Sequence, residues 1–249
     1  MNRSHDSQTA KKCVYEAQRA GIQNISIDLI YGVPEYLKRD WLKDLDLAIA
    51  LKTPHISAYN LTVENRTVLS SWVNENKCTM PDQEVCNIEY EQLVSRLSNA
   101  GYKQYEVSNF SKKGYKSRHN SSYWGMTPYL GIGPSAHSYD GNRIRKWNVA
   151  NNMKYIKEIK GGQLNPSKEV LSDIDLANEI ILLGTRTTFG VSINKVLNYL
   201  NQNQKNVFLA QLELLKKKEL ISIHSHCFFV EDNSRFLSDY IARELIILS

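Results

Sequence analysis

SRHNSSYWGMTPYLGIGPSAHS, residues Ser117–Ser138, is the most distinctive segment of this 249-residue chain. It combines two histidines, a Tyr-Trp pair and two closely spaced glycines, and it follows neither helical nor strand periodicity. Connecting segments lie at the surface, and a long ordered one that is rich in such residues is typically a functional site. We therefore predict a binding loop over residues 117–138.

The composition is that of an ordinary globular protein, with 42% hydrophobic residues, 23% charged residues and a net charge of +5. No apolar run approaches the roughly 20 residues that a membrane span needs. The start, MNRSHDSQTAKK, lacks the apolar core of a secretory signal. We expect a cytoplasmic protein without a membrane span.

The cysteines argue against a metal centre. Cys13, Cys78, Cys86 and Cys227 are far apart, and no two of them form a C-x-x-C pair. Metal and cluster sites need thiolates at short, fixed spacing, and disulfide frameworks are dense in small secreted chains. Four reduced thiols are therefore expected.

Hydrophobic periodicity organises the first part of the chain. It predicts a helix over 8–20, a strand over 24–32, a second helix over 39–51 and a second strand over 55–61. Right-handed crossovers between such elements give a parallel strand pair. The fold class is therefore α/β.

The rest of the chain is expected to contain helices and strands in a different order. A long helix from Pro81-Asp82 to Ala100 precedes a third strand over 103–110, and Asp140-Gly141 predicts a hairpin. From Ser172 onward the pattern predicts helices and a hairpin that resemble a winged-helix module: helices over 173–188, 192–200, 207–218 and 236–247, and strands over 220–223 and 227–230. We place the domain boundary between residues 165 and 166, giving domains 1–165 and 166–249.

Nucleic acid is not expected as a partner of this module. Its candidate recognition helix over 207–218 carries mainly leucines and a cluster of lysines at its end alone. A recognition helix needs a basic face along the groove that it enters.

Asp28 is the first candidate binding residue. It lies among apolar residues on a strand that we expect to be buried on both faces, toward the carboxyl end where ligands of parallel sheets bind. A buried carboxylate without a partner is costly. Asp28 is therefore expected to contact a ligand such as a ribose, or to form a structural salt bridge.

His119, Asn120, Tyr123 and Trp124 form the second candidate group. An imidazole can bind a metal or transfer a proton, and the Tyr-Trp pair can stack on a flat apolar ligand such as a porphyrin. A structural, hydrogen-bonded histidine is the alternative. His137 is open to either interpretation, and the glycines at 131 and 133 permit close approach of a ligand or a sharp corner.

Five segments together resemble one family. NISIDLIYGVP, HISAYNLTVE, YEVSNF, HNSSYW and YLGIGPSAHS occur in the order and spacing of the oxygen-independent coproporphyrinogen III oxidase-like radical SAM proteins. The HNSSYW segment resembles the branch of HemW-type heme chaperones. The resemblance implies the last strands and helices of a radical SAM (β/α) barrel, followed by a small helical, winged-helix-like C-terminal domain.

The resemblance also implies cofactors and roles. In the family a four-iron–four-sulfur cluster, S-adenosylmethionine and heme are bound. Arg3, Asp28 and Thr62 match positions near S-adenosylmethionine. The positions that match the heme or porphyrin loop are His119, Asn120, Tyr123 and Trp124, and His137 matches the loop that closes over the pocket.

One departure limits what the resemblance implies. The C-x-x-x-C-x-x-C cluster motif of the family is absent, and Met1 falls just before the family's fifth barrel strand. We therefore expect no cluster and no radical chemistry from this chain alone. The strand over 24–31 is expected to be exposed on one side, or to pair with another copy or with a separate N-terminal half.

The expected function is that of a heme chaperone, which binds heme and passes it to acceptor proteins. Two alternatives stay open. One is an oxygen-independent coproporphyrinogen III oxidase of porphyrin biosynthesis, and the other is a stand-alone, non-enzymatic heme-binding module.

Overall fold

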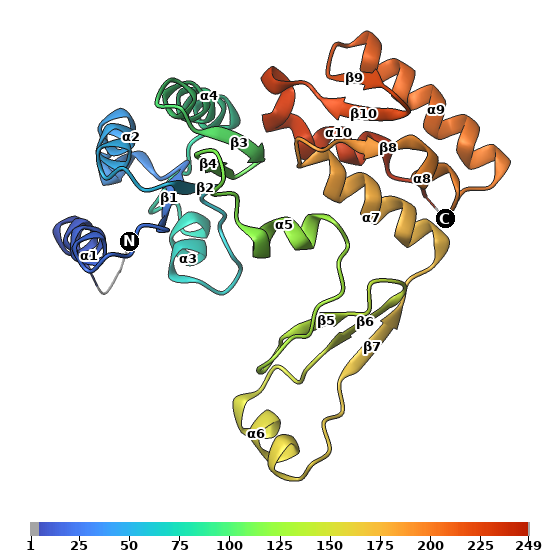
Figure 1. The fold of residues 1–249 in the computed structure, drawn as a ribbon, viewed down its shortest axis with the longest axis horizontal. Coiled ribbons are helices and arrows are strands. Elements are labelled where there is room, and N and C mark those ends of the chain that lie inside the picture. The colour runs from blue at the N-terminus through green and yellow to red at the C-terminus, as the bar shows by residue number, and fades with distance from the viewer. Residues whose placement is uncertain (1–4, 249) are drawn as a thin grey trace. The chain divides into compact units, whose positions relative to one another are not determined.

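A computed structural model of the chain describes residues 5–248, which divide into two units between Ser117 and Arg118. Each unit has its own sheet or sheets and is described by itself (Figure 1). The domain boundary expected at residues 165 and 166 falls inside the second unit, and that division into domains stays a prediction. No helix within the described residues is long and apolar enough to cross a membrane.

The first unit is built on a four-stranded sheet of order β1-β2-β4-β3. The predicted parallel pair is confirmed, with Ile27 opposite Ile56 in the register of the two strands. The single third strand expected over 103–110 is wrong, because the chain turns at residues 107–108 and returns as an antiparallel strand. The strands are β1 (Ser26–Tyr31), β2 (His55–Asn60), β3 (Lys103–Glu106) and β4 (Asn109–Ser111).

Aspartates begin the three longer helices of this unit. Asp6, Asp40 and Asp82 each accept a hydrogen bond from a backbone N–H in the first turn, which satisfies a donor that the helix leaves unpaired. A short helix follows Thr67, in a region for which the sequence predicts no element. The helices are α1 (Ser7–Arg19), η1 (Glu35–Leu37), α2 (Trp41–Ala50), α3 (Val68–Asn74) and α4 (Gln83–Asn99).

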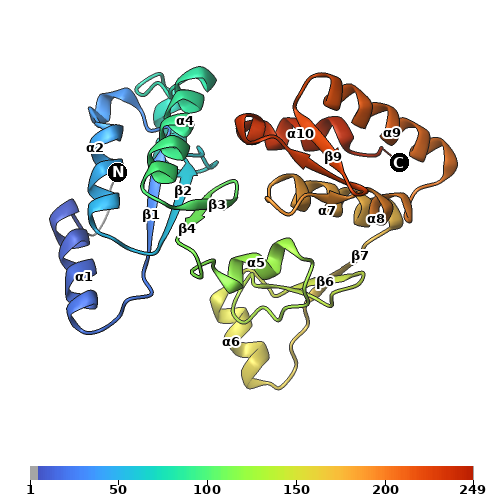
Figure 2. The ribbon, with the colours of Figure 1, turned by 45° about the horizontal axis from the view of Figure 1, so that its top comes forward.

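The core of the first unit lies between its sheet and the helices α2 and α4, which run side by side in both views (Figures 1 and 2). The Trp41 indole N–H donates to the carbonyl of Glu89, 2.8 Å away, and joins the two helices. Side chains that are at most 1% exposed fill this core: Leu45, Ile56, Leu93, Leu97, Tyr105 and Phe110. Burying such side chains is the main favourable term in folding.

Strand β1 forms one edge of the sheet, so its outer backbone groups have no strand partner among the described residues. Ser26 and Asp28 on this strand are exposed. The strand is thus an edge strand within the described chain, and its pairing with another copy or with a separate N-terminal half stays a prediction. The expected burial of this strand on both faces is wrong, because Ser26 and Asp28, which share one face of the strand, are exposed.

The second unit begins with the distinctive segment. Its first part is a helix, α5 (Arg118–Trp124), where the sequence predicts an irregular loop. The hairpin predicted at Asp140-Gly141 is confirmed, and the Asp140 carboxylate accepts hydrogen bonds from the backbone N–H groups of Ile144 and Asn142, which lower its pKa. The hairpin strands β5 (His137–Tyr139) and β6 (Ile144–Trp147) join β7 (Ser167–Val170) in an antiparallel sheet.

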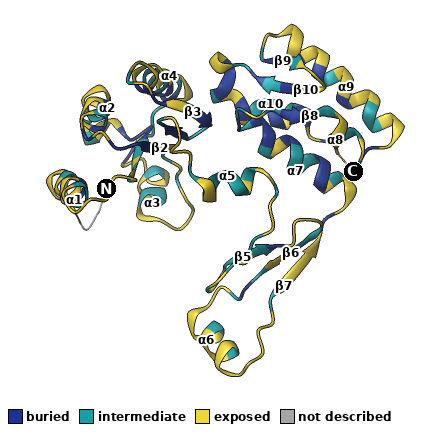
Figure 3. Ribbon diagram, in the orientation of Figure 1, coloured by how far each residue is buried: buried dark blue, intermediate teal, exposed yellow. Residues whose placement is uncertain are grey.

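Helix α6 (Asn152–Lys160) lies between β6 and β7 along the chain, and it and β7 are largely exposed (Figure 3). The sequence predicts no element over these residues. The short length of both elements explains this, because a periodic pattern needs about 11 residues before it is distinct.

The C-terminal part contains the predicted helices and hairpin. Ser172 and Asp175, and likewise Asn201 and Gln204, form capping boxes that begin two of the helices. The second box starts its helix five residues before the predicted position. The elements are α7 (Asp173–Thr185), β8 (Val191–Ser192), α8 (Ile193–Leu197), α9 (Gln202–Lys217), β9 (Ile221–His224), β10 (Cys227–Val230), η2 (Asp232–Leu237) and α10 (Ser238–Leu245).

These C-terminal elements enclose one apolar core. Ile181, Phe208, Phe228 and Ile241 are each completely buried in it. The strands form a sheet of order β8-β10-β9 that packs with α7, α9 and α10 around the core. The result is one apolar cluster to which the α-helices and strands of this part contribute side chains.

Candidate functional site

Helix α5 sets the geometry of the distinctive segment. His119 and Tyr123 are four residues apart, so they lie on the same face of the helix. Their ring centroids are 5.0 Å apart and their planes are at 84°, an edge-to-face contact. The Ser122 hydroxyl donates to the His119 carbonyl, 2.7 Å away, within the same turn. The imidazole of His119 is exposed and rests against the ring of Tyr123.

Aromatic rings continue from this contact into the interior of the second unit. Tyr123 contacts Tyr129 edge-on at 4.9 Å, and Tyr129 lies 6.3 Å from Tyr139. Tyr129 and Tyr139 also exchange two backbone hydrogen bonds, of 2.9 and 3.0 Å. Tyr139 is buried against Leu171 and Leu176. The exposed imidazole is thus connected to a buried tyrosine by a continuous series of aromatic contacts.

The glycine-containing loop that follows α5 makes a corner. A Cβ on Gly131 would collide with the backbone of His137, so only glycine fits there. The buried amide of Asn148 donates to the carbonyls of Gly131 and Gly133, at 3.3 and 2.9 Å. Of the two interpretations left open for these glycines, the sharp corner accounts for Gly131.

His137 and His119 contact different aromatic residues. It is exposed, and its ring stacks on Trp147 with centroids 5.8 Å apart and an interplanar angle of 26°. His137 and Trp147 are opposite each other in the register of β5 and β6.

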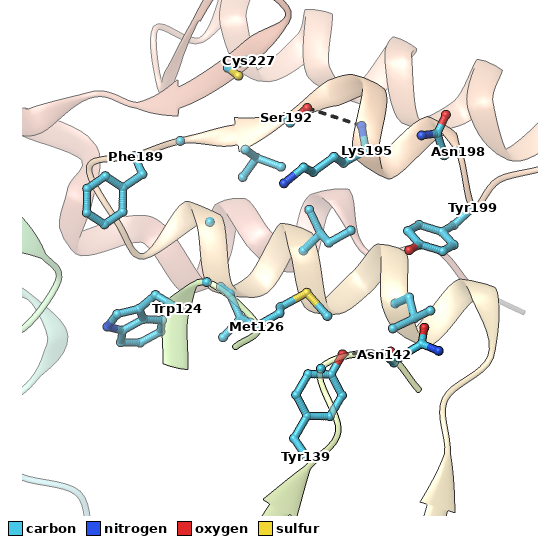
Figure 4. Close-up of a pocket in the computed structure, with 18 residues that line it drawn as sticks. Trp124, Met126, Tyr139, Asn142, Phe189, Ser192, Lys195, Asn198, Tyr199 and Cys227 are labelled. Atoms are coloured by element: carbon cyan, nitrogen blue, oxygen red, sulfur yellow. Dashed lines mark hydrogen bonds between the residues drawn. The ribbon is translucent and has the colours of Figure 1, made fainter. Parts of the chain in front are cut away.

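A pocket of about 540 Å³ lies beside α5 in the second unit (Figure 4). Its volume is within the range of ordinary ligand sites. One wall comes from the segment around Trp124 and the β5–β6 turn, and the other comes from α7, β8 and α8. The lining residues that carry functional groups or aromatic rings are Trp124, Met126, Tyr139, Asn142, Phe189, Ser192, Lys195, Asn198, Tyr199 and Cys227.

Two ion pairs hold the walls of this pocket together. Arg143 contacts Asp173 at 2.5 Å, and Arg145 contacts Glu179 at 2.7 Å, so the hairpin is tied to α7 at two points. The hydrogen bond to Glu179 raises the pKa of Arg145 above its ordinary value. Arg143 also donates to the carbonyl of Leu171, 3.1 Å away. These contacts fix the angle at which the hairpin meets α7.

The predicted site residues fall into separate groups. His119 and Tyr123 are in contact, and Trp124 lines the pocket. Asn120 is half-buried on α5. Asp28 and Thr62 are exposed residues of the first unit, and Arg3 lies outside the described residues. The roles assigned to all of them stay predictions.

The cysteines of the described chain do not form a cluster site. Cys78 and Cys86 are buried in the first unit, Cys13 is exposed on α1 and Cys227 is half-buried on β10. No group of three or more histidine, cysteine or acidic side chains among the described residues could hold a metal ion. Burial raises the pKa of the Cys86 thiol, which disfavours the thiolate that an iron–sulfur cluster needs. The residues present therefore do not fit a cluster.

Sequence reasoning missed several residues of the pocket. Phe189, Lys195 and Tyr199 lie far beyond the predicted binding loop over residues 117–138, and none belongs to a motif. No local pattern marks them. They come together only when the hairpin packs on α7.

Comparisons with known proteins agree with this architecture. Residues 171–237 match the HemN C-terminal domain. The chain is 30% identical to the heme chaperone HemW of Bacillus subtilis, covering 97% of this chain and 64% of that protein. It is 32% identical to HemW of Mycobacterium tuberculosis, covering 99% and 61%. A mitochondrial radical S-adenosyl methionine domain-containing protein 1 from Bos taurus is 32% identical over 77% of this chain and 45% of its own length.

The structural comparison gives the same overall fold. Coproporphyrinogen III oxidase (HemN) from Escherichia coli, a radical SAM enzyme, matches with a TM-score of 0.75 over 98% of this chain and 60% of that one. The sequence identity is 17%, so this likeness concerns the fold alone. The chain is mixed α/β without a closed barrel among its described residues. It spans about six-tenths of the length of the bacterial relatives, and the predicted family resemblance is confirmed.

Proposed function

We propose that this chain, a homologue of the HemW heme chaperones that carries a HemN C-terminal domain, binds heme at α5 and passes it to acceptor proteins. The observation that carries the proposal is the exposed His119 imidazole, held edge-on against Tyr123. Imidazole is a common axial ligand of heme iron, and its orientation is normally fixed by a neighbouring group. Here Tyr123 is that group.

The exposure of these rings suits cargo that must be released. Tyr123 is 39% exposed, so a tetrapyrrole lying against it keeps part of its surface in reach of an acceptor. A fully enclosed heme would have to wait for local opening before transfer. In the proposed function, His119 binds the iron and Tyr123 supports the imidazole.

Porphyrin oxidation is the second candidate function, and the match of residues 171–237 to the HemN C-terminal domain supports it. That chemistry depends on an iron–sulfur cluster, which the described cysteines do not fit. We therefore derive no oxidative step from the residues of this chain. Both candidate functions allow a metal-free porphyrin to bind. Only the heme chaperone function requires that the affinity depend on a bond between His119 and the iron.

Titration with hemin, followed by the Soret absorbance, tests the proposal. We expect saturable binding with a shifted Soret band, and His119→Ala should weaken binding at least tenfold and change the band. The exposed His224 on β9 serves as a matched control, and His224→Ala should bind like the unmodified chain. Equal binding by His119→Ala and His224→Ala, or no binding by the unmodified chain, would contradict the proposal.

Metal-free protoporphyrin gives a second comparison. Because it has no iron to bind, His119→Ala should leave its affinity nearly unchanged, while Tyr123→Ala should weaken both ligands through the lost ring contact. An equal loss of hemin and protoporphyrin in His119→Ala would show that the imidazole contributes by packing rather than by ligation.

Reconstitution with iron and sulfide tests the absence of a cluster. The four cysteines do not gather at one place within either unit, so we expect no stoichiometric iron–sulfur chromophore. Iron and acid-labile sulfide should be removed by gel filtration. A stable four-iron cluster that is lost in cysteine variants would refute this expectation.

A further inference from the structure

The pocket beside α5 has one charged group, the exposed Lys195, in a lining that mixes aromatic and aliphatic side chains with polar groups such as Asn142 and Asn198. Among the described residues that line it, Lys195 alone is charged, and no aspartate or glutamate is present. Lys195 extends from α8 across the pocket toward Phe189, above α7 (Figure 4). No ion pair of the Lys195 ammonium is present among the described residues, and the arginines nearby are already paired with Asp173 and Glu179. The pocket thus offers an unmatched cation.

Four aromatic side chains line the pocket beside its polar groups, which suits a flat ligand with a polar edge. Trp124 and Tyr139 come from one side and Phe189 and Tyr199 from the other, and the floor is formed by the aliphatic side chains of α7. Aromatic side chains bind ring faces and edges with large apolar contact area. The Tyr139 hydroxyl already donates to the carbonyl of Asn142, 2.9 Å away, so that donor is not free for a ligand.

We propose that this pocket binds the carboxylate-bearing edge of the tetrapyrrole, with Lys195 as the partner of a carboxylate and Trp124 and Phe189 against the ring. The proposal rests on the proposed function, since it assumes that the ligand is a tetrapyrrole. A single lysine without any arginine argues for a carboxylate rather than a phosphate, which usually meets several donors or a bidentate guanidinium.

This assignment gives the C-terminal domain a direct part in ligand binding. Trp124 belongs to the HNSSYW segment. Phe189 and Lys195 belong to residues 171–237, which match the HemN C-terminal domain. The two walls are joined by the Arg143–Asp173 and Arg145–Glu179 pairs, so the pocket exists only while the hairpin is docked on α7. Lys195 would distinguish tetrapyrroles that carry free carboxylates from those that do not.

Hemin and its dimethyl ester, titrated into the full chain, test the role of Lys195. Lys195→Met should weaken hemin binding about tenfold, equivalent to about 1.4 kcal/mol, and Lys195→Arg should restore most of it. Binding of the dimethyl ester, which has no carboxylate, should be the same in the unmodified chain and in Lys195→Met. The exposed Lys217 on α9 provides the matched control, and Lys217→Met should bind hemin normally.

Cysteine alkylation locates the ligand independently of affinity. Cys227 lines the pocket and is half-buried, while Cys13 is exposed on the first unit. Saturation with zinc protoporphyrin should slow N-ethylmaleimide labelling of Cys227 several-fold and leave Cys13 unchanged, as measured by peptide mass spectrometry.

The outcomes separate the two proposals. If hemin binds and requires His119 but is insensitive to Lys195→Met, and Cys227 stays unprotected, the pocket assignment is overturned while the proposed function stands. If the unmodified chain binds neither hemin nor zinc protoporphyrin, both proposals fail.

Discussion

The first unit and the C-terminal domain use comparable amounts of secondary structure but close their cores differently. In the domain formed by α7 to α10, every strand and helix contributes to one buried cluster, and Phe208 and Phe228 are completely enclosed. In the first unit, β1 is an edge strand with exposed Ser26 and Asp28 and half-buried Ile27. The C-terminal sheet also has edge strands, β8 and β9, but they are shorter than β1, which offers a longer edge to a further strand. The comparison indicates that the C-terminal domain is the self-sufficient part.

Phe208→Ala should cause the largest loss of stability. Phe208 is 0% exposed, and its truncation leaves a cavity that typically costs about 3–5 kcal/mol. Hydrogen exchange measured by mass spectrometry should report lost protection in α7, α9 and α10 and little change in the first unit. The neighbouring Val207 is 61% exposed, so Val207→Ala should change the free energy by at most about 0.5 kcal/mol. Equal losses of stability in Phe208→Ala and Val207→Ala would contradict the closed core described for the C-terminal domain.

A pair of isoleucines tests the open edge within the first unit itself. Ile56 on β2 is fully buried and Ile27 lies opposite it on β1, half-buried. We expect Ile56→Ala to cost about 2–5 kcal/mol of local stability and Ile27→Ala about 1 kcal/mol. Hydrogen exchange in β2 and α2 measures both. If Ile27→Ala is as costly as Ile56→Ala, the edge strand is covered in solution, by another copy or another chain.

Acidic pH should produce the smallest effect, through His55. Its Nδ1 lies 2.7 Å from the Ser26 hydroxyl of the edge strand, and its Nε2 lies 2.8 Å from the Tyr105 hydroxyl. Burial lowers the pKa of His55, and the nearby Asp28 carboxylate opposes this shift. The unfolded chain therefore binds more protons than the folded one once the pH falls below about 6.5.

The stability of the first unit should thus be complete above about pH 6.5 and decline as the pH falls further. Thermal unfolding of the chain between pH 7.5 and 5.5 measures the decline, and His55→Gln should lose this part of the pH dependence. Stability that rises on acidification in the unmodified chain, relative to His55→Gln, would mean that His55 is protonated in the folded state.

Predictions from the sequence succeeded where the pattern was long and amphipathic. The helices now seen as α1, α2, α4, α7 and α9, the parallel pair β1 and β2, and the hairpins at Asp140-Gly141 and β9–β10 were all expected. They failed where elements are short: α3, α5 and α6 have seven to nine residues each. In α5, polar and aromatic residues hide the helical period, yet that period is what brings His119 onto Tyr123.

Asp28 shows a second limit of prediction from the sequence, because its exposure was not foreseen. The apolar run around it predicts a strand, and the strand is present. Whether a strand is central or at an edge depends on its neighbours in the sheet, which come from residues far along the chain. The same holds for Lys195. Its proposed role in binding depends on Trp124 and Phe189, which line the same pocket.

The sequence by itself determined the family resemblance, the α/β class, the main helices and the importance of the HNSSYW segment. These depend on local period, capping and motif order, which residues close in sequence specify. Only the tertiary structure decided that β1 is an edge strand, that the cysteines stay apart and that a single lysine faces an aromatic pocket. Those properties arise when distant segments pack together, and the packing is set by the whole chain rather than by any window of it.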